Sequence, residues 1–303
     1  MKKNKFMMKK NIAGFDLSQT KCAKLKRILD SRLDKVLADP SDSSNHIYWD
    51  AGYFNLDNST VFQNATLQQK KDILKVASRE LLEEAYFIEK AGMGYMAKMV
   101  LLSETTEERM LYSLFAADET THLAKIMPFL ERIPVDTDDL FLQLLGDVVE
   151  SDDKSVILFV LQVVLEGWGL SHYRSLAKGC GDRDLSFVFR SFLDDESRHH
   201  ATGVTLFQQQ HLDLSSKRAI VEILASFLEM IRVGPQRVLN AVEMVLGDLS
   251  RSQKIKLFEE LDTESHSSSR LSILRSLIGK EGSIFVTELE EKGLFSAYQN
   301  NWV

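Results

Sequence analysis

The chain has 303 residues, 44% of them hydrophobic, which is enough to bury one large core or two small ones. Its formal net charge of −7 argues against bulk nucleic-acid binding, which requires clustered Lys and Arg. Cys22 and Cys180 lie far apart and form no C-x-x-C motif, so the sequence excludes a disulfide framework and a zinc finger and favours a reducing, cytoplasmic location.

The composition predicts an all-α chain without a membrane span. The chain contains only four Pro and fifteen Gly, which favours long uninterrupted helices. The longest apolar run, Val156 to Leu165, is broken by Gln162 and is too short to cross a bilayer. Five of the first ten residues are Lys, and no apolar stretch typical of a signal peptide follows them. We interpret this end as a disordered tail, with a partner-docking arm as the alternative.

Residues 1–65 are predicted to precede the main helical unit. Apolar residues recur at helical spacing from Leu17 to Ala38, and Pro40 follows, so this range is expected to be a helix after a loose tail at 1–15. Residues 46–65 are irregular and rich in aromatic side chains. We interpret them as a segment that packs over the bundle, and a lid over a substrate site is the alternative.

Residues 66–212 are predicted to form a four-helix bundle. Its helices are expected at about 66–102, 105–130, 154–178 and 183–211. Thr105 or Thr106 can cap the second helix. The connection at 133–152 is the longest in the bundle and carries a short helix of its own. A long crossover between the second and third helices is a known form of the four-helix bundle.

Residues 213–303 are predicted to form a C-terminal helical extension. A fifth long helix is expected after Ser215, and Gly234-Pro235 should kink or split it. Shorter helices are expected near 250–262, 267–279 and 283–292. We assign this part to packing against the bundle, with homodimer formation as a further role.

Two Glu-x-x-His motifs stand in the second and fourth bundle helices. With the Asp that precedes each Glu, they are Asp118-Glu119-Thr120-Thr121-His122 and Asp195-Glu196-Ser197-Arg198-His199. Positions i and i+3 lie on one face of a helix, so the carboxylate and imidazole of each motif can reach the same ion. Glu89 and Glu166 each lie thirty residues before the Glu of one motif. These six residues supply the ligand set of a carboxylate-bridged two-metal site.

An internal repeat supports this pairing of the two halves. Gly92 and Gly169 each follow the isolated Glu of their helix by three residues, and Phe115 and Phe192 each precede the motif Glu by four. A helical Gly costs about 1 kcal/mol relative to Ala, so these glycines either allow close helix contact or leave room for dioxygen or substrate. The two Phe are expected to line that room, with segment 46–65 as its nearest cover; simple core packing is the alternative.

The charges of the six residues suit two divalent first-row metal ions. Two such ions neutralise four Glu carboxylates, which would otherwise be costly to bury and would shift toward protonation. Mixed oxygen and nitrogen ligands favour iron or manganese over zinc. Asp118 and Asp195 are each expected to bond the outer ring N–H of a metal-bound His across the site, with Arg198 beside them. His172 and His200 are expected to lie off the inner face.

These residues carry a resemblance to a known family. On the two Asp-Glu-x-x-His motifs, Glu89 and Glu166, residues 66–211 resemble the ferritin-like di-iron carboxylate superfamily. The resemblance implies a ferritin-like bundle that holds two Fe ions or a Mn/Fe pair. Its members include ferritins, rubrerythrins, ribonucleotide reductase small subunits, acyl desaturases, multicomponent monooxygenases, aldehyde-deformylating oxygenases and arylamine N-oxygenases.

Departures from the patterns of these members narrow the expected function. Ile126 stands where the ribonucleotide reductase subunit has its radical Tyr, and Phe192 stands where arylamine N-oxygenases have a seventh ligand. Two cysteines cannot supply the Cys₄ iron domain usual in rubrerythrins, and ferritin subunits are much shorter than this chain.

Once these members of the superfamily are set aside, the sequence resembles an O₂-activating oxygenase or oxidase. Its substrate would be a small organic or acyl compound that it hydroxylates, N-oxygenates, desaturates or cleaves at a C–C bond. No flavin or nicotinamide motif is visible, so electrons would come from a reductase or ferredoxin. The alternative is an iron- or peroxide-handling protein without an organic substrate.

Overall fold

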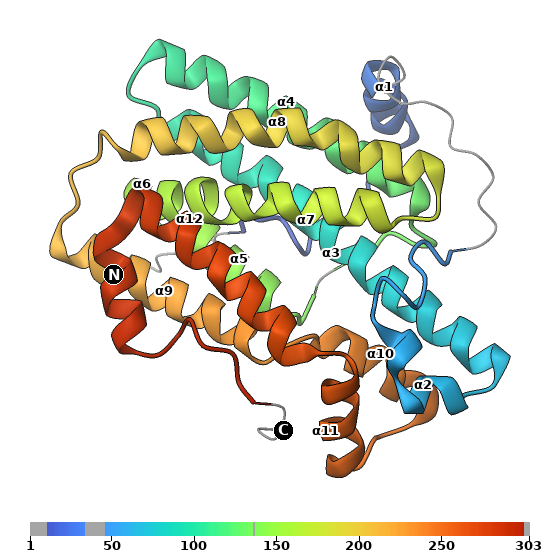
Figure 1. Cartoon of the computed structure of the whole chain (residues 1–303). Helices are drawn as coiled ribbons and strands as arrows, with labels where there is room; N and C mark the ends of the chain where they lie inside the picture. The colour runs from blue at the N-terminus through green and yellow to red at the C-terminus, as the bar shows by residue number, and fades with distance from the viewer. Residues whose placement is uncertain (1–10, 34–45, 136, 300–303) are drawn as a thin grey trace, which may run out of the picture.

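The computed structural model describes residues 11–33, 46–135 and 137–299. Within these ranges every assigned element is helical, apart from one isolated β-bridge between Trp49 and Cys180 (Figure 1). The prediction of an all-α chain is confirmed for them. The basic tail at 1–10 and the end of the first expected helix, at 34–38, lie outside the described residues.

Four long helical stretches form the central part of the molecule. In chain order they are α3 (Leu67–Leu102), α4 (Thr106–Ile126), the run of α6 (Lys154–Ile157), η3 (Leu158–Leu165) and α7 (Glu166–Gly179), and α8 (Arg183–Phe207). α3 packs on α4, and α7 packs on α8; α4 and α8 also lie side by side (Figure 1). This pairing of two helical hairpins matches the internal repeat of the sequence and is compatible with a ferritin-like bundle.

Side-chain caps fix where these helices begin. Thr66 and Gln69 form a capping box at the start of α3, and the Thr105 side chain accepts a hydrogen bond from the Glu108 backbone N–H at the start of α4. Asp182 caps α8 in the same way. The second helix ends at Ile126, earlier than expected, because a 3₁₀ turn containing a Pro, η2 (Met127–Phe129), follows it.

The third bundle helix is not a uniform α-helix. Its middle part, η3, is π-helical over eight residues and ends just before Glu166. Such widened turns are uncommon and concentrate at functional sites. The continuous helix Lys154–Gly179 is long and apolar enough to cross a membrane by length and composition alone. However, 56% of its most apolar window is buried in the molecule, as is typical of a core helix.

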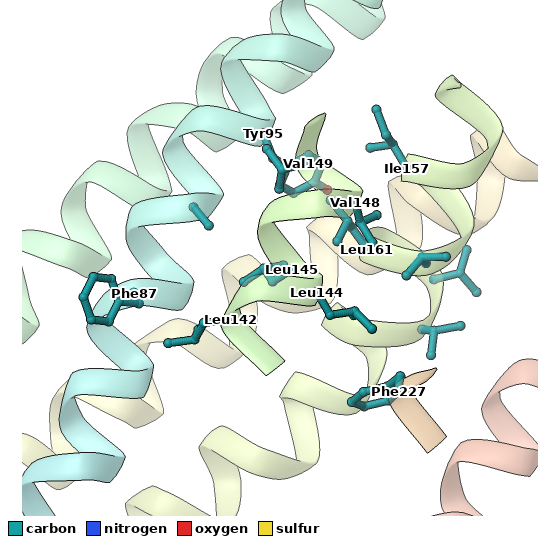
Figure 2. Packing of buried hydrophobic residues seen from close by; sticks show 14 of the residues in the cluster. Phe87, Tyr95, Leu142, Leu144, Leu145, Val148, Val149, Ile157, Leu161 and Phe227 are labelled. Atoms are coloured by element: carbon teal, nitrogen blue, oxygen red, sulfur yellow. The ribbon is translucent and has the colours of Figure 1, made fainter. Parts of the chain in front are cut away.

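The crossover carries α5 (Leu140–Glu150), capped by Asp139. Figure 2 shows that α5 packs between neighbouring helices through its apolar side chains, with Leu145 and Val149 among them. The helix contacts α3, η3 and the C-terminal part of the chain. The crossover is therefore part of the core rather than a surface connection.

The C-terminal part consists of four helices. They are α9 (Leu214–Arg232), α10 (Gln236–Leu246), α11 (Arg251–Glu260) and α12 (Thr263–Glu291). Gly234, with a φ of 81°, and Pro235 separate α9 from α10, as the sequence predicts. The two last expected helices are one element, α12, kinked at Gly282, where a Cβ would lie 2.5 Å from the rings of Phe159 and Phe285.

These helices do not form a separate packing unit. α9 and α12 cover η3 and belong to the main hydrophobic cluster. α10 and α11 form a smaller second cluster with α2 (Thr60–Asn64) and the first turns of α3, toward the lower right of Figure 1. The expected boundaries after residues 65 and 212 are therefore not marked by a break in packing.

The N-terminal residues differ from the expected loose tail. Residues 11–17 pack on α3, where the Ile12 carbonyl lies so close that a Cβ at Gly94 would come within 1.7 Å of it. The buried ammonium of Lys90 donates hydrogen bonds to the carbonyls of Phe15 (3.1 Å) and Leu17 (2.7 Å). This need for acceptors holds the segment in place. The helix that follows, α1 (Ala23–Leu33), begins later than expected and buries none of its described residues.

Segment 46–65 packs over one end of the bundle. Tyr48 and Trp49 are buried, and their side chains donate hydrogen bonds to the carbonyls of Phe129 (2.7 Å) and Leu176 (3.0 Å). A short turn, η1 (Leu56–Asn58), and α2 complete it. The aromatic residues thus tie the segment to two bundle helices, which favours the packing interpretation over that of a mobile lid.

Candidate metal centre

The six residues expected to bind metal converge inside the bundle. Their ligand atoms form two groups, within each of which the atoms lie no more than 4.8 Å apart. The first group is Glu89, Glu119, His122 and Glu196, and the second is Glu119, Glu166 and His199. Glu119 belongs to both groups. All six are buried except Glu166, which is half-buried.

Two carboxylates reach both imidazoles. One oxygen of Glu119 lies 3.3 Å from His199 Nδ1, and the other lies 3.7 Å from His122 Nδ1. Glu196 is placed similarly, with its oxygens 3.6 Å from His122 Nδ1 and 3.9 Å from His199 Nδ1. Glu89 approaches only His122, at 3.1 Å. Glu119 and Glu196 thus lie between the two imidazoles, where carboxylates could bridge two metal ions.

Two buried atoms of the cluster lack hydrogen-bond partners among the described residues. They are Oε2 of Glu166 and Nδ1 of His199. An unsatisfied buried polar atom costs about 1–3 kcal/mol, so native proteins rarely leave one without a reason. Both atoms belong to residues of the second group, where a bound cation would satisfy them. The donor set therefore fits a metal, while its identity is not fixed by this geometry.

The pKa values of the clustered carboxyl groups also indicate that the cluster fits a metal. Burial raises the pKa of Glu89 to about 7 and that of Glu166 to about 8, and it raises the pKa of Glu196 well above its usual value. Burial also acts on Glu119, but the two nearby imidazoles of His122 and His199 outweigh it and lower the pKa of Glu119. Without a cation the cluster thus retains protons, which bound metal ions would displace.

Each imidazole has a carboxylate on its outer side. Nε2 of His122 lies 3.2 Å from Asp195 Oδ2, and Nε2 of His199 lies 3.4 Å from Asp118 Oδ2. Each Asp thus serves the His of the other motif, because α4 and α8 run antiparallel. With metal bound, their carboxylates would accept from the outer ring N–H and leave Nδ1 of each imidazole to the metal. Arg198, which is exposed, donates to the other oxygen of Asp195.

Two tyrosines that the sequence did not single out for the site bind the remaining carboxylates. Tyr95 donates a hydrogen bond of 2.8 Å to Glu166, and Tyr173 donates one to Glu89. Tyr173 lies two turns after Glu166 on the same face, a spacing that could have indicated it. Tyr95 lies six residues after Glu89 and off its face, so no spacing rule points to it.

Gln162 explains the polar interruption of the apolar run. Its side chain accepts a hydrogen bond from Tyr112 (2.6 Å) and donates one to the His199 carbonyl (3.0 Å). Its own carbonyl faces the ring of His200, at 3.0 Å from Nδ1. Gln162 therefore ties η3 to the ligand helix α8, and His200 lies off the metal site, as expected.

A cavity of about 90 Å³ adjoins the metal ligands. Apart from the carboxylates and tyrosines, its walls are mostly apolar and include Ile88, Phe141, Leu145, Val149, Leu161 and Trp168. Figure 2 shows Val149 and Leu145 of α5 near Tyr95 of α3. The cover of this cavity is therefore α5 of the crossover, not segment 46–65, none of whose residues line it.

The two repeat-related glycines line this cavity but differ in role. A Cβ at Gly92 would lie 2.8 Å from the Glu119 carboxylate, so this glycine allows Glu119 to approach α3. A Cβ at Gly169 would meet nothing within 4 Å, so this glycine borders open space. Gly92 thus fits the expectation of a close contact between helices, and Gly169 fits the expectation of room for dioxygen or substrate.

Gly92→Ala is expected to displace the Glu119 carboxylate and to lower metal occupancy, because the methyl group would stand 2.8 Å from it. Gly169→Ala is the matched control, since its methyl group enters free space. It should keep the metal content of the native protein and gain about 1 kcal/mol of stability. Elemental analysis and thermal unfolding of both variants check this; equal metal loss in both would contradict it.

Phe115 and Phe192 do not line this cavity, contrary to expectation. The Phe192 ring stacks on His122 with centroids 4.0 Å apart, and the Phe115 ring lies 4.4 Å from that of His199. Antiparallel packing of α4 and α8 places each Phe against the His of the other motif. The two rings therefore support the imidazoles instead of lining the open space.

His172 also departs from its expected position. It lines the cavity three residues after Gly169, on the same face of α7, and stacks on Trp168 with ring centroids 6.1 Å apart. It is not a member of either ligand group.

Comparison of the sequence with protein-family models gives no match, and comparison with curated proteins gives none either. The interpretation of the site therefore rests on its geometry and chemistry.

Proposed function

We propose that the chain is a ferritin-like non-haem di-iron oxygenase or oxidase, or its Mn/Fe counterpart, which uses O₂ to oxidise a small organic or acyl substrate. The observation that carries the proposal is the pair of carboxylates, Glu119 and Glu196, each of which faces both buried imidazoles. Carboxylate and imidazole ligands suit iron and manganese. Two ferrous ions held by these ligands would supply electrons to dioxygen, and a reductase or ferredoxin would reduce the ions again.

The cavity favours an organic substrate over simple iron handling. Its walls beside the ligands are mostly apolar, and a hydrated ion gains nothing from such walls. Dioxygen and the apolar end of an organic molecule can both enter such a space. Leu145 and Val149 would exclude water and position the substrate, since small misplacements slow reactions by about 100-fold.

The remaining residues around the ligands would hold the site in place. Asp118 and Asp195 fix the imidazole orientations, and Tyr95 and Tyr173 hold the carboxylates of Glu166 and Glu89. A site supported in this way needs little reorganisation during reaction.

A single-turnover experiment tests the proposal. Protein loaded anaerobically with Fe(II) is mixed with O₂, with and without an alkyl carboxylic acid, an alkyl aldehyde or an arylamine. We expect O₂ consumption that depends on bound iron, and at least one compound that accelerates it and is itself oxidised. Consumption that no compound affects, with ferric iron accumulating in the protein, would support the iron-handling alternative instead.

A further inference from the structure

A second pocket lies next to the metal cavity and shares one residue with it. This outer pocket has a volume of about 500 Å³ and a polar lining that includes Glu80, Glu83, Arg132, Asp138 and Asp139. Glu84 is the one described residue that lies in the walls of both. Among the described residues, the one side chain that lines both the outer pocket and the metal cavity is therefore titratable.

Glu84 faces His172 across this wall. Oε1 of Glu84 lies 3.6 Å from Nε2 of His172, a buried nitrogen without a hydrogen-bond partner among the described residues. On the outer side, Oε2 of Glu84 pairs with Arg237, which also contacts Asp139 at 2.7 Å. Arg270 of α12 acts electrostatically on His172, and Glu80 acts in the same way on Arg237. A carboxylate and an imidazole thus stand in line from the outer pocket to the metal cavity.

Glu84 and His172 differ from the other titratable groups that line the cavity in their relation to the metal ligands. The remaining ones are metal ligands or tyrosines that donate to those ligands. Burial and the charge of Arg270 lower the pKa of His172 to about 4, so its ring is neutral near pH 7. A neutral imidazole has one accepting and one donating nitrogen, so it can take a proton on one side and give it on the other.

Oxygen chemistry at the site requires protons. Hydroxylation is balanced as R–H + O₂ + 2e⁻ + 2H⁺ → R–OH + H₂O, where the electrons come from the external reductase or ferredoxin. The mostly apolar cavity walls offer protons few other routes. We propose that Glu84 and His172 form a proton relay from the outer pocket to the metal cavity. This inference rests on the proposed oxygenase function.

The relay assigns an order to the transfers. A proton from water in the outer pocket binds Glu84, crosses the 3.6 Å gap to Nε2 of His172 by carboxylate rotation or through a water molecule, and leaves the ring into the cavity. Glu84 returns to its ion pair with Arg237. Neither residue belongs to a ligand group, so their loss should leave the metal content unchanged.

Three variants test the relay on metal-loaded protein. Glu84→Gln, His172→Gln and His172→Gly should keep the native metal content, and each should slow O₂ consumption by about 100-fold, the usual scale of general acid–base effects. Added imidazole should restore most of the rate in His172→Gly and none in Glu84→Gln. Glu83→Gln, which alters the outer pocket only, is the matched control and should react as the native protein does.

A second readout needs no metal. In metal-free protein with ¹⁵N-labelled histidine, the Nε2 resonance of His172 should shift in Glu84→Gln and stay in place in Glu83→Gln. Native rates in the three variants, or slowing without imidazole rescue together with an unchanged resonance, would overturn the relay. A native protein that consumes no O₂ with iron bound would overturn the proposed function, and the relay with it.

Discussion

Glu119→Ala should leave the protein with fewer than about one metal ion per chain, whereas Glu89→Ala and Glu166→Ala should each leave about one. The reason is that Glu119 belongs to both ligand groups, while Glu89 belongs only to the first and Glu166 only to the second. Removal of a shared carboxylate deprives both ions of a ligand and of a neutralising charge. Elemental analysis after anaerobic loading with Fe(II) measures the three occupancies.

The metal-free variant should still fold. In the metal-free protein the Glu119 carboxylate is stabilised by both imidazoles, which lower its pKa, so Glu119→Ala is expected to melt below the native metal-free protein but to remain folded at room temperature. Glu107→Ala, an exposed residue of the same helix, is the control and should hold both ions. Equal metal loss in the variants of Glu89, Glu119 and Glu166 would argue against a bridging role.

Asp118→Asn and Asp195→Asn should each weaken metal binding by about 10- to 100-fold, the usual effect of losing a carboxylate behind a ligand His. Each carboxylate lies within 3.4 Å of the outer nitrogen of one imidazole. A neutral amide can present either oxygen or nitrogen to that position, so it holds the tautomer less firmly. Competition of the protein with a chelator of known affinity gives the change in dissociation constant.

The same helix provides the control for this effect. Asp194 is next to Asp195 in sequence but is exposed, so Asp194→Asn should bind metal as the native protein does. Arg198→Ala should have a small effect, because its side chain is largely exposed and an exposed ion pair contributes little. Native affinity in both Asp118→Asn and Asp195→Asn would show that these carboxylates are ordinary surface acids of the helices.

The ligand cluster was predictable because it depends on helix periodicity. A spacing of three residues puts the Glu and His of a motif on one face, and the equal distance of thirty residues identifies Glu89 and Glu166. The crossing of Asp118 to His199 and of Asp195 to His122 follows from two similar motifs on antiparallel helices. All of these features follow from helical spacing and from the pairing of helices within the bundle.

The cavity was not predictable, since it depends on how α5 packs against the four bundle helices. Gly92 and Gly169 occupy equivalent positions in the repeat, yet one contacts Glu119 and the other borders free space. No sequence pattern indicates the π-helical turns of η3 or the burial of residues 11–17 on α3. Leu111 lies four residues before Phe115 and is therefore expected on the same inward face of its helix, but it is exposed and Tyr112 is buried in its place. The helical spacing of residues in the sequence does not predict these differences.

Anomalous diffraction at the iron edge, on crystals grown after anaerobic iron loading, tests the two-metal centre most directly. The arrangement of the ligands predicts two iron peaks per chain, both beside Glu119 and Glu196, one next to Glu89 and His122 and the other next to Glu166 and His199. A single peak, or a zinc signal in place of iron, would contradict a bridged di-iron centre in this bundle.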